Sequence, residues 1–270
     1  MGDVIACANQ KGGVGKTTTV INLATYLALD GRRVLVVDLD PQGNATSGLG
    51  FDRTSSGASI YPALVEGLAA NTLVQATQVD GLWLIPSGRD LAGAEVELVD
   101  LPQRERKLRQ ALAGLRSSFD FILLDCPPAV GLLTVNALTS ADAVLVPIQC
   151  EYYALEGLSQ LLTTIDLVRD NLNPRLRLAG VLLTMYDART TLSSDVAAEV
   201  RRHLGDNVYR TVVPRSVRLA EAPSYGRPIA RYSPESRGAQ SYRALAAEVL
   251  EREAATASAA HFASPAVVSA

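Results

Sequence analysis

Short apolar runs alternate with amphipathic stretches along most of the chain. Continuous apolar runs, typical of strands buried on both faces, occupy Val4–Ala8, Arg33–Asp38, Phe121–Asp125, Ala143–Ile148, Leu178–Thr184 and Val208–Val213, with a weaker run at Leu82–Ile85. Helical spacing of apolar positions fits Thr17–Leu29, Arg104–Arg116, Leu155–Asn171, Thr191–Leu204 and Gly238–Glu253. This alternation predicts an α/β fold, in which a single domain is built on a doubly wound, mostly parallel sheet with helices on both faces.

Two segments lack such a pattern. Residues 46–59 are rich in Gly, Ser and Thr, which predicts an irregular surface loop. Residues 254–270 are rich in Ala and Ser with little charge, and we expect them to form a disordered tail. The predicted domain therefore spans residues 1–253.

A glycine-rich loop joins the first predicted strand to the first predicted helix, and it carries most of the chemical information. Its residues are Lys11, Gly12, Gly13, Val14, Gly15, Lys16, Thr17 and Thr18. Glycines let the backbone curl so that several N–H groups converge on one anion, and the helix N-terminus adds partial positive charge. Lys16 can then reach the β- and γ-phosphates, and the Thr17 hydroxyl can ligate Mg²⁺. The sequence therefore predicts a nucleotide site that uses ATP and Mg²⁺.

The loop departs from the ordinary phosphate-binding pattern at one position. Lys11 stands where the first glycine would be, and two lysines so close together repel each other unless an anion lies between them. This form resembles the deviant Walker A loop of the ParA/MinD class of P-loop ATPases. In that class the first lysine reaches across a dimer interface to the partner's nucleotide.

Carboxylates follow two of the predicted strands. Asp38 and Asp40 follow the second strand, and Asp125 ends the strand at Phe121–Asp125. Asp40 precedes a proline, so on its own it would be read as turn chemistry. Beside a phosphate loop, however, Asp40 can orient or deprotonate water near the γ-phosphate, Asp38 can hold Mg²⁺ through water, and Asp125 has the Walker B position that holds Mg²⁺ directly or through water.

Charge is distributed unevenly. The whole chain has a net charge of -3, but residues 175–243 carry twelve arginines against six carboxylates, a net charge of +6. Such asymmetry indicates a surface that faces a polyanion, although arginines that merely coat a solvated surface would give the same count.

A longer resemblance covers residues 3–252. The strings at 9–19, 38–50, 125–128, 131–138, 149–162 and 213–228 look like those of the chromosomal ParA proteins, also called Soj. The resemblance implies an ATP-dependent homodimer that binds double-stranded DNA without sequence preference. It also implies slow ATP hydrolysis stimulated by a ParB-type centromere-binding partner, and a cytoplasmic, nucleoid-associated protein.

The same resemblance assigns roles to individual residues. Lys11 becomes the cross-interface lysine, Lys16 the Walker lysine, Thr17 the Mg²⁺ ligand, Asp40 the water-positioning residue and Asp125 the Walker B acid. Met185 and Pro214 match positions that pack the adenine in this family. Arg189 and Arg218 match positions used for DNA, and Arg201 and Arg202 are further candidates on the predicted helix Thr191–Leu204.

Other classes remain to be separated from this reading. A MinD-like membrane-cycling ATPase needs a basic amphipathic C-terminal helix, whereas the last predicted helix is more acidic than basic and has a plain core-facing stripe. An iron–sulfur reductase needs cysteines placed between two subunits, whereas Cys7, Cys126 and Cys150 lie in apolar contexts typical of buried thiols. The long match at 149–162 argues against a small-molecule kinase of the same fold. Whether the protein serves a chromosome or a plasmid stays open.

Overall fold

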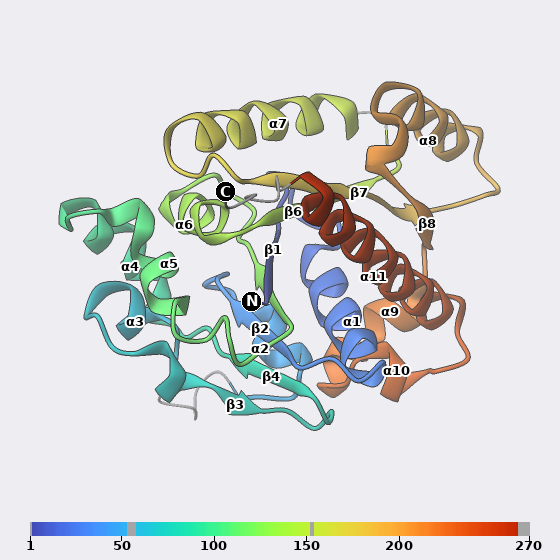
Figure 1. The fold of residues 1–270 in the computed structure, drawn as a ribbon. Helices are drawn as coiled ribbons and strands as arrows, with labels where there is room; N and C mark the ends of the chain where they lie inside the picture. The colour runs from blue at the N-terminus through green and yellow to red at the C-terminus, as the bar shows by residue number, and fades with distance from the viewer. Residues whose placement is uncertain (1, 53–57, 152–153, 264–270) are drawn as a thin grey trace, which may run out of the picture.

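The computed structural model describes residues 2–52, 58–151 and 154–263 (Figure 1). In this part of the protein the strands form an 8-stranded sheet in the order β3-β4-β2-β5-β1-β6-β7-β8. The strands are β1 (Asp3–Cys7), β2 (Val34–Asp38), β3 (Gln75–Ala76), β4 (Leu82–Ile85), β5 (Phe121–Asp125), β6 (Ala143–Gln149), β7 (Arg177–Tyr186) and β8 (Val208–Pro214). Neighbouring strands are parallel except β3 and β4. The predicted mostly parallel α/β fold is confirmed.

Helices cover both faces of the sheet (Figure 1). The α-helices are α1 (Lys16–Leu29), α2 (Asn44–Gly48), α3 (Tyr61–Val65), α4 (Leu91–Glu97), α5 (Lys107–Leu112), α6 (Leu132–Ser140), α7 (Ala154–Asn171), α8 (Thr191–Leu204), α9 (Val217–Glu221), α10 (Ile229–Tyr232) and α11 (Arg237–Ala263). Short 3-10 helices are η1 (Ala70–Leu73), η2 (Leu98–Asp100), η3 (Arg104–Arg106), η4 (Gly205–Asn207) and η5 (Ala222–Tyr225).

The central strand β1 shows why the strands are apolar on both faces. Val4 and Ala6 pack into the core formed with α5, α6 and α7, whereas Ile5 and Cys7 pack into the core formed with α1 and α11. Successive side chains of a strand point to opposite faces, so a strand covered on both sides needs an uninterrupted apolar run.

The register of the central strands sets the place of the site. Cys7 of β1 and Asp38 of β2 both pair with Asp125 of β5, so three strands end side by side. The turns that follow β1, β2 and β5 therefore meet at the carboxyl edge of the sheet, where parallel α/β folds bind their ligands.

The two segments without a clear sequence pattern are more ordered than we expected. The surface loop predicted at 46–59 begins inside α2, where Thr46 is fully buried, and its residues 53–57 lie outside the described residues. Residues 254–263 continue α11, whereas we expected a disordered tail from residue 254. This extension is rich in alanine, the strongest helix former, and residues 264–270 lie outside the described residues.

Helix α6 was not expected at all. Its sequence LLTVNALTS is mostly apolar with no helical period, so an apolar run of this length gives no clear indication of helix or strand. The predicted helix at Arg104–Arg116 is shorter than expected, because η3 precedes α5 and turns follow Leu112.

Candidate functional site

The loop after β1 has the backbone of a phosphate cradle. Gly13 and Gly15 have backbone φ values of +74° and +92°, which residues other than glycine rarely adopt. Gly15 is the N-cap of α1, so the first turn of that helix faces the loop. A Cβ atom built at Gly12 or Gly13 would meet nothing within 4 Å, so this part of the loop is open to a ligand.

The two lysines of the loop point in different directions. Lys16 is 6% exposed, and its Nζ donates a hydrogen bond to the Lys11 carbonyl oxygen at 3.2 Å. The Lys11 side chain is 44% exposed, and its Nζ donates to Oε2 of Glu151 at 3.0 Å. Lys16 therefore points into the loop that carries it, whereas Lys11 reaches away from that loop.

A cleft of about 570 Å³ lies beside the loop. The predicted residues that line it are Gly12, Gly13, Gly15, Lys16, Thr17, Thr18, Asp40 and Met185. Five residues predicted to bind nucleotide or metal do not line the cleft. Lys11 points to Glu151, Val14 is buried, and Pro214 ends β8 opposite Tyr186. The predicted metal ligands Asp38 and Asp125 are fully buried behind the lining. The structure thus brings Met185 to the candidate nucleotide cleft but does not bring Pro214 there.

Sequence reasoning missed much of the far wall of this cleft. Lining residues without an assigned role were Ile21, Asn22, Gln42, Asn44, Ser47, Gly48, Pro128, Leu219, Ala222, Pro223, Ser224, Arg227 and Pro228. Most of them lie within the strings 38–50 and 213–228, which the family resemblance had singled out. That resemblance was the available signal, because apart from Asp38 and Asp40 the residues of these strings belong to no motif with a mechanism of its own.

Two buried carboxylates lie side by side at the ends of β2 and β5. Asp38 is 0% exposed and accepts hydrogen bonds from the Thr46 amide at 2.8 Å, the Thr46 hydroxyl at 2.7 Å and the Asp40 amide at 3.2 Å. Burial raises the pKa of Asp38 to about 6, against the opposing effect of these hydrogen bonds. Asp38 therefore holds the start of α2 and the Asp40 turn in place.

Asp125 is also 0% exposed, and neither of its carboxylate oxygens accepts a hydrogen bond of normal geometry among the described residues, although the Thr17 side chain is near enough to favour the charged form. Burial raises the pKa of Asp125 well above its usual value, and the nearby Asp38 charge raises it further, while Thr17 and Lys16 oppose the rise. Buried carboxylates are normally satisfied, and Mg²⁺ prefers oxygen ligands. The orphaned Asp125 beside Thr17 thus fits a divalent cation.

Asp40 enters the cleft from the turn after β2. The side chain is 7% exposed, and its Oδ1 accepts a hydrogen bond from the Gln42 amide at 2.9 Å. The Ser87 hydroxyl donates to the Asp40 carbonyl oxygen at 2.7 Å, which fixes the backbone of the turn. Asp40 is therefore held at the cleft by its own turn and by the loop after β4.

The end of β7 supports the phosphate loop from the opposite side. The Thr184 hydroxyl shares its single hydrogen between the carbonyl oxygens of Val14 at 2.8 Å and Ile148 at 2.9 Å. The next residue, Met185, has a backbone φ of +50°, which is uncommon for a residue with a bulky side chain. Strained backbone of this kind is typical of functional sites, and here it places Met185 at the cleft.

The candidate DNA-binding arginines lie outside the cleft. Arg189 is 86% exposed and donates to both carboxylate oxygens of Asp187, at 2.9 and 2.7 Å. Arg218 is 60% exposed and donates to Oε2 of Glu221 at 3.0 Å. The two candidates on α8 differ, since Arg202 pairs with Glu199 and exposed Arg201 has no ion pair among the described residues.

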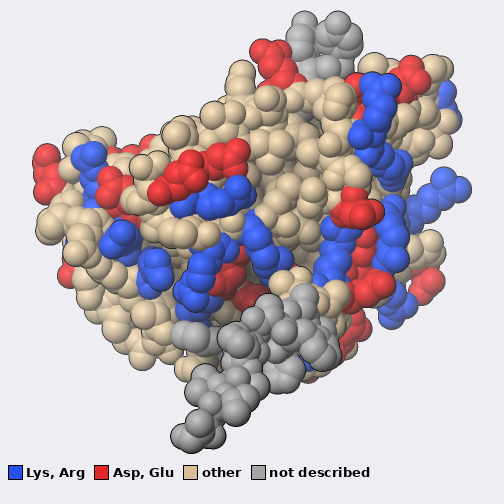
Figure 2. Space-filling model, turned by 45° about the horizontal axis from the view of Figure 1, so that its top comes forward, with Lys and Arg blue, Asp and Glu red and all other residues tan. Residues whose placement is uncertain are grey.

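Figure 2 shows basic and acidic side chains interleaved on the side of the molecule where α8 and β8 lie. Three of the four candidate arginines are thus bound to a neighbouring carboxylate, and the excess of arginine in residues 175–243 is partly neutralised locally.

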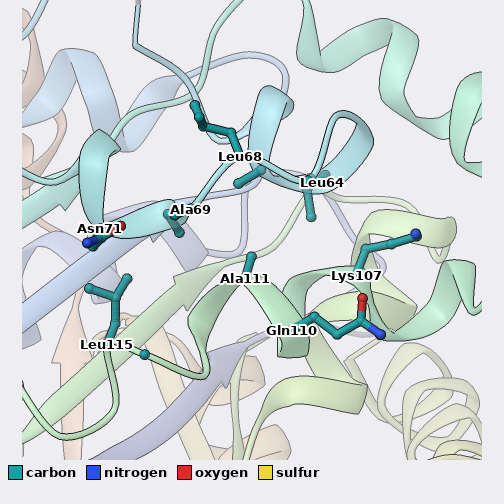
Figure 3. Close-up of a pocket in the computed structure, with 12 residues that line it drawn as sticks. Leu64, Leu68, Ala69, Asn71, Lys107, Gln110, Ala111 and Leu115 are labelled. Carbon is teal, nitrogen blue, oxygen red and sulfur yellow. The ribbon is translucent and has the colours of Figure 1, made fainter.

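A second hollow, of about 460 Å³, lies between α5 and the segment from α3 to η1 (Figure 3). Leu64, Leu68 and Ala69 line one side, and Lys107, Gln110 and Ala111 line the other. None of the residues predicted to bind nucleotide, metal or DNA lines this hollow.

The cysteines are relevant to the iron–sulfur reductase alternative, and the helices to the question of a membrane-spanning segment. Cys7, Cys126 and Cys150 are all free and buried, as the sequence predicted, and burial raises the pKa of Cys150 to about 11. Within residues 2–52, 58–151 and 154–263, none of the helices has the length and apolar character needed to cross a membrane.

Comparison with known proteins agrees with this geometry. The model of the AAA domain family matches residues 2–178. The Bacillus subtilis protein named sporulation initiation inhibitor protein Soj is 55% identical over 92% of this chain and 98% of its own length. The Thermus thermophilus protein named chromosome-partitioning ATPase Soj is 56% identical, with coverages of 92% and 95%. The Caulobacter vibrioides chromosome partitioning protein ParA is 52% identical, with coverages of 93% and 94%.

Solved structures share the fold, and one of those described below holds ADP and magnesium. A Mycobacterium smegmatis structure, titled cobyrinic acid a,c-diamide synthase with bound ADP and magnesium, has a TM-score of 0.84 and 41% identity, and the match covers 95% of this chain and 97% of that one. The cell division ATPase MinD of Pyrococcus furiosus has a TM-score of 0.77 and 28% identity, with coverages of 93% and 99%. Sequence, fold and cleft together place this chain in the ParA/Soj family of chromosome-partitioning ATPases.

Proposed function

We propose that this protein is a DNA-partitioning ATPase whose ATP-bound homodimer binds double-stranded DNA without sequence preference. A ParB-type centromere-binding protein then releases the dimer by stimulating a weak basal hydrolysis. The observation that carries the proposal is the opposite orientation of the two loop lysines, with Lys16 inside the loop and Lys11 directed away from it. An outward lysine is useless for a nucleotide bound in its own cleft but suits one presented by a second copy.

In this proposal the residues around the cleft divide the work of hydrolysis. The loop amides and Lys16 would bind the phosphates, and Thr17 and Asp125 would hold Mg²⁺, with Asp38 assisting through water. When bound, Mg²⁺ would neutralise charge on the phosphate oxygens. Asp40 orients a water whose oxygen forms the new bond to the γ-phosphorus while the bond to the bridging oxygen breaks, which gives ADP and inorganic phosphate.

The partner's Lys11 completes the site only in the dimer. Phosphoryl transfer needs little covalent help from a protein, so positioning and electrostatics set its rate. In the monomer Lys11 is paired with Glu151, an interaction between half-exposed side chains that contributes at most about 1 kcal/mol. A phosphate group of greater charge can therefore displace Glu151 and draw Lys11 across the interface.

Met185 lines the cleft at its strained backbone position and is the proposed contact for the adenine. Pro214 lies outside the lining of the cleft, so its proposed adenine contact requires the end of β8 to move when nucleotide binds.

The experiment is to size the protein with ADP and with a non-hydrolysable ATP analogue, then to titrate it with unrelated DNA duplexes and with anionic lipid vesicles. We expect dimers with the analogue alone, and binding of those dimers to every duplex with similar affinity. ATP-dependent binding to vesicles but not to DNA would favour the MinD-like alternative. Equal DNA affinity with either nucleotide would contradict the proposed switch.

A further inference from the structure

Hydrogen bonds connect the phosphate-loop helix to the segment that carries Arg218. Asn22 of α1 is 4% exposed, and its Nδ2 donates to the Thr18 carbonyl oxygen at 2.8 Å. Its Oδ1 accepts a hydrogen bond from the backbone N–H of Ile229 at 2.8 Å. Ile229 is the first residue of α10, so a buried side chain ties the start of α10 to a residue that lines the cleft.

The other end of α10 is tied to Arg218. The hydroxyl of Tyr232, the last residue of α10, donates to Oε2 of Glu221 at 3.0 Å. Arg218 donates to the same oxygen at 3.0 Å. We call Asn22, Ile229, Tyr232, Glu221 and Arg218 the α1–α9 network, because it runs from the helix after the phosphate loop to the arginine on α9.

The same segment is a wall of the cleft. Leu219, Ala222 and Pro223 face the cleft from α9 and η5. The segment is also packed closely against α2 and the turn after it, because a Cβ atom on Gly226 would lie 2.7 Å from the Cα of Gly50. A ligand in the cleft therefore touches the inner side of the segment whose outer side presents Arg218.

We propose that Asn22, Tyr232 and Glu221 are positioning residues that hold Arg218 in the orientation that binds a DNA phosphate, and that they transmit occupancy of the nucleotide cleft to it. The inference rests on the proposed function, since it assumes that Arg218 contacts DNA. Arginine has five N–H donors, and the bond to Glu221 uses one of them. Fixing the long side chain in advance removes part of the entropy lost on binding, while the remaining donors stay free for a phosphate.

The decisive variant is Tyr232→Phe, which removes one hydroxyl without changing charge. The ring can keep its stack on Tyr225, where the centroids are 4.9 Å apart. We expect the affinity for DNA in the presence of a non-hydrolysable ATP analogue to fall about fivefold, as for loss of one hydrogen bond to a carboxylate. DNA binding with ADP, dimerisation and basal hydrolysis should match the parent protein.

Tyr225→Phe is the matched control, because the Tyr225 side chain is 64% exposed and belongs to the same stack but not to the network. Its DNA affinity should equal that of the parent. An equal loss in both variants would mean that the hydroxyls touch DNA directly, and unchanged or higher affinity of Tyr232→Phe would mean that Glu221 only masks Arg218. Either result overturns the inference.

A double variant tests transmission along the network. Asn22→Ala should lower DNA affinity at saturating analogue, and Asn22→Ala with Tyr232→Phe should lower it no further than the more damaging single change, since both break one connection. Additive losses would overturn the network. If the parent protein binds DNA with ATP and Tyr232→Phe binds equally well, only this inference fails; if the parent shows no ATP-dependent DNA binding, the proposed function fails first.

Discussion

At the scale of single residues, the two lysines of the phosphate loop are close in sequence, but their side chains point in different directions. We expect Lys16→Ala to weaken nucleotide binding by about a hundredfold or more, because it removes a buried charge-assisted contact from the cradle. Lys11→Ala should leave nucleotide binding measurable but prevent ATP-dependent dimerisation, because Lys11 does not line its own cleft. Titration with a fluorescent nucleotide and light scattering with a non-hydrolysable analogue measure the two effects. A normal ATP dimer of Lys11→Ala would rule out the cross-interface role.

A second prediction at this scale concerns Asp40. Asp40→Ala should bind ATP and Mg²⁺ like the parent but hydrolyse ATP about a hundredfold more slowly, because the phosphate cradle is built from backbone amides of another loop. Dimers should then accumulate, which sizing in the presence of ATP would detect. Hydrolysis at the parental rate would instead make Asp38 the candidate. Asp38 is less suited to position the attacking water, since three protein donors already hold its buried carboxylate in one orientation.

At the scale of elements, whether a helix or strand could be predicted from the sequence depended on which contacts stabilise it. Strands such as β5 and helices such as α8 were located to the residue, because an uninterrupted apolar run or a regular helical period marks each one. Helix α2 was not expected, because its order comes from Asp38, which accepts from the amide and hydroxyl of Thr46. A contact between residues eight apart leaves no periodic signal, so the hydrophobic pattern could not reveal α2, and only the family resemblance of residues 38–50 pointed to this wall of the cleft.

Helix α11 supplies a prediction about stability at the same scale. Glu248 is 4% exposed and accepts hydrogen bonds from the backbone N–H groups of Arg210 at 2.8 Å and Thr211 at 3.0 Å, and from Arg252 at 3.0 Å. It thereby joins α11 to the edge strand β8. Glu248→Gln should lower the free energy of unfolding by about 2 kcal/mol, because it weakens a buried charge-assisted set of bonds. Chemical denaturation measures this, with Glu251→Gln as the control on the exposed face of the same helix.

Glu248 also predicts how the stability of the fold changes with pH. Burial raises the pKa of Glu248, but the hydrogen bonds from the Arg210 and Thr211 N–H groups, the Thr211 side chain and Arg252 together lower it by more, so the net shift is downward. A carboxyl with a lowered folded-state pKa stabilises the fold above its ordinary pKa, and this stabilisation is lost as pH falls through the folded value. Glu248→Gln should therefore lose less stability than the parent on acidification. An equally steep acid decline in both proteins would show that Glu248 is not responsible.

At the scale of the whole molecule, an acidic protein carries a segment with an excess of arginine. Under the proposed function, joining two copies makes that excess sufficient to bind DNA. Each phosphate contact releases counterions, so joining two copies multiplies the affinity, and binding should fall steeply with salt. Arg189→Glu and Arg218→Glu should each weaken binding at least tenfold on every duplex, with ATP-dependent dimerisation and basal hydrolysis intact.

Arg32→Glu is the control for that prediction, because it makes the same change of charge in the turn before β2, at the edge of the sheet opposite the cleft. Filter binding over a range of salt concentrations separates the outcomes. Loss of affinity in the Arg189 and Arg218 variants but not in Arg32→Glu would place the DNA contact on the side of α8 and α9. Similar losses in all three would mean that net charge alone governs binding, and no loss in any of them would leave these arginines as a solvated surface paired with Asp187 and Glu221.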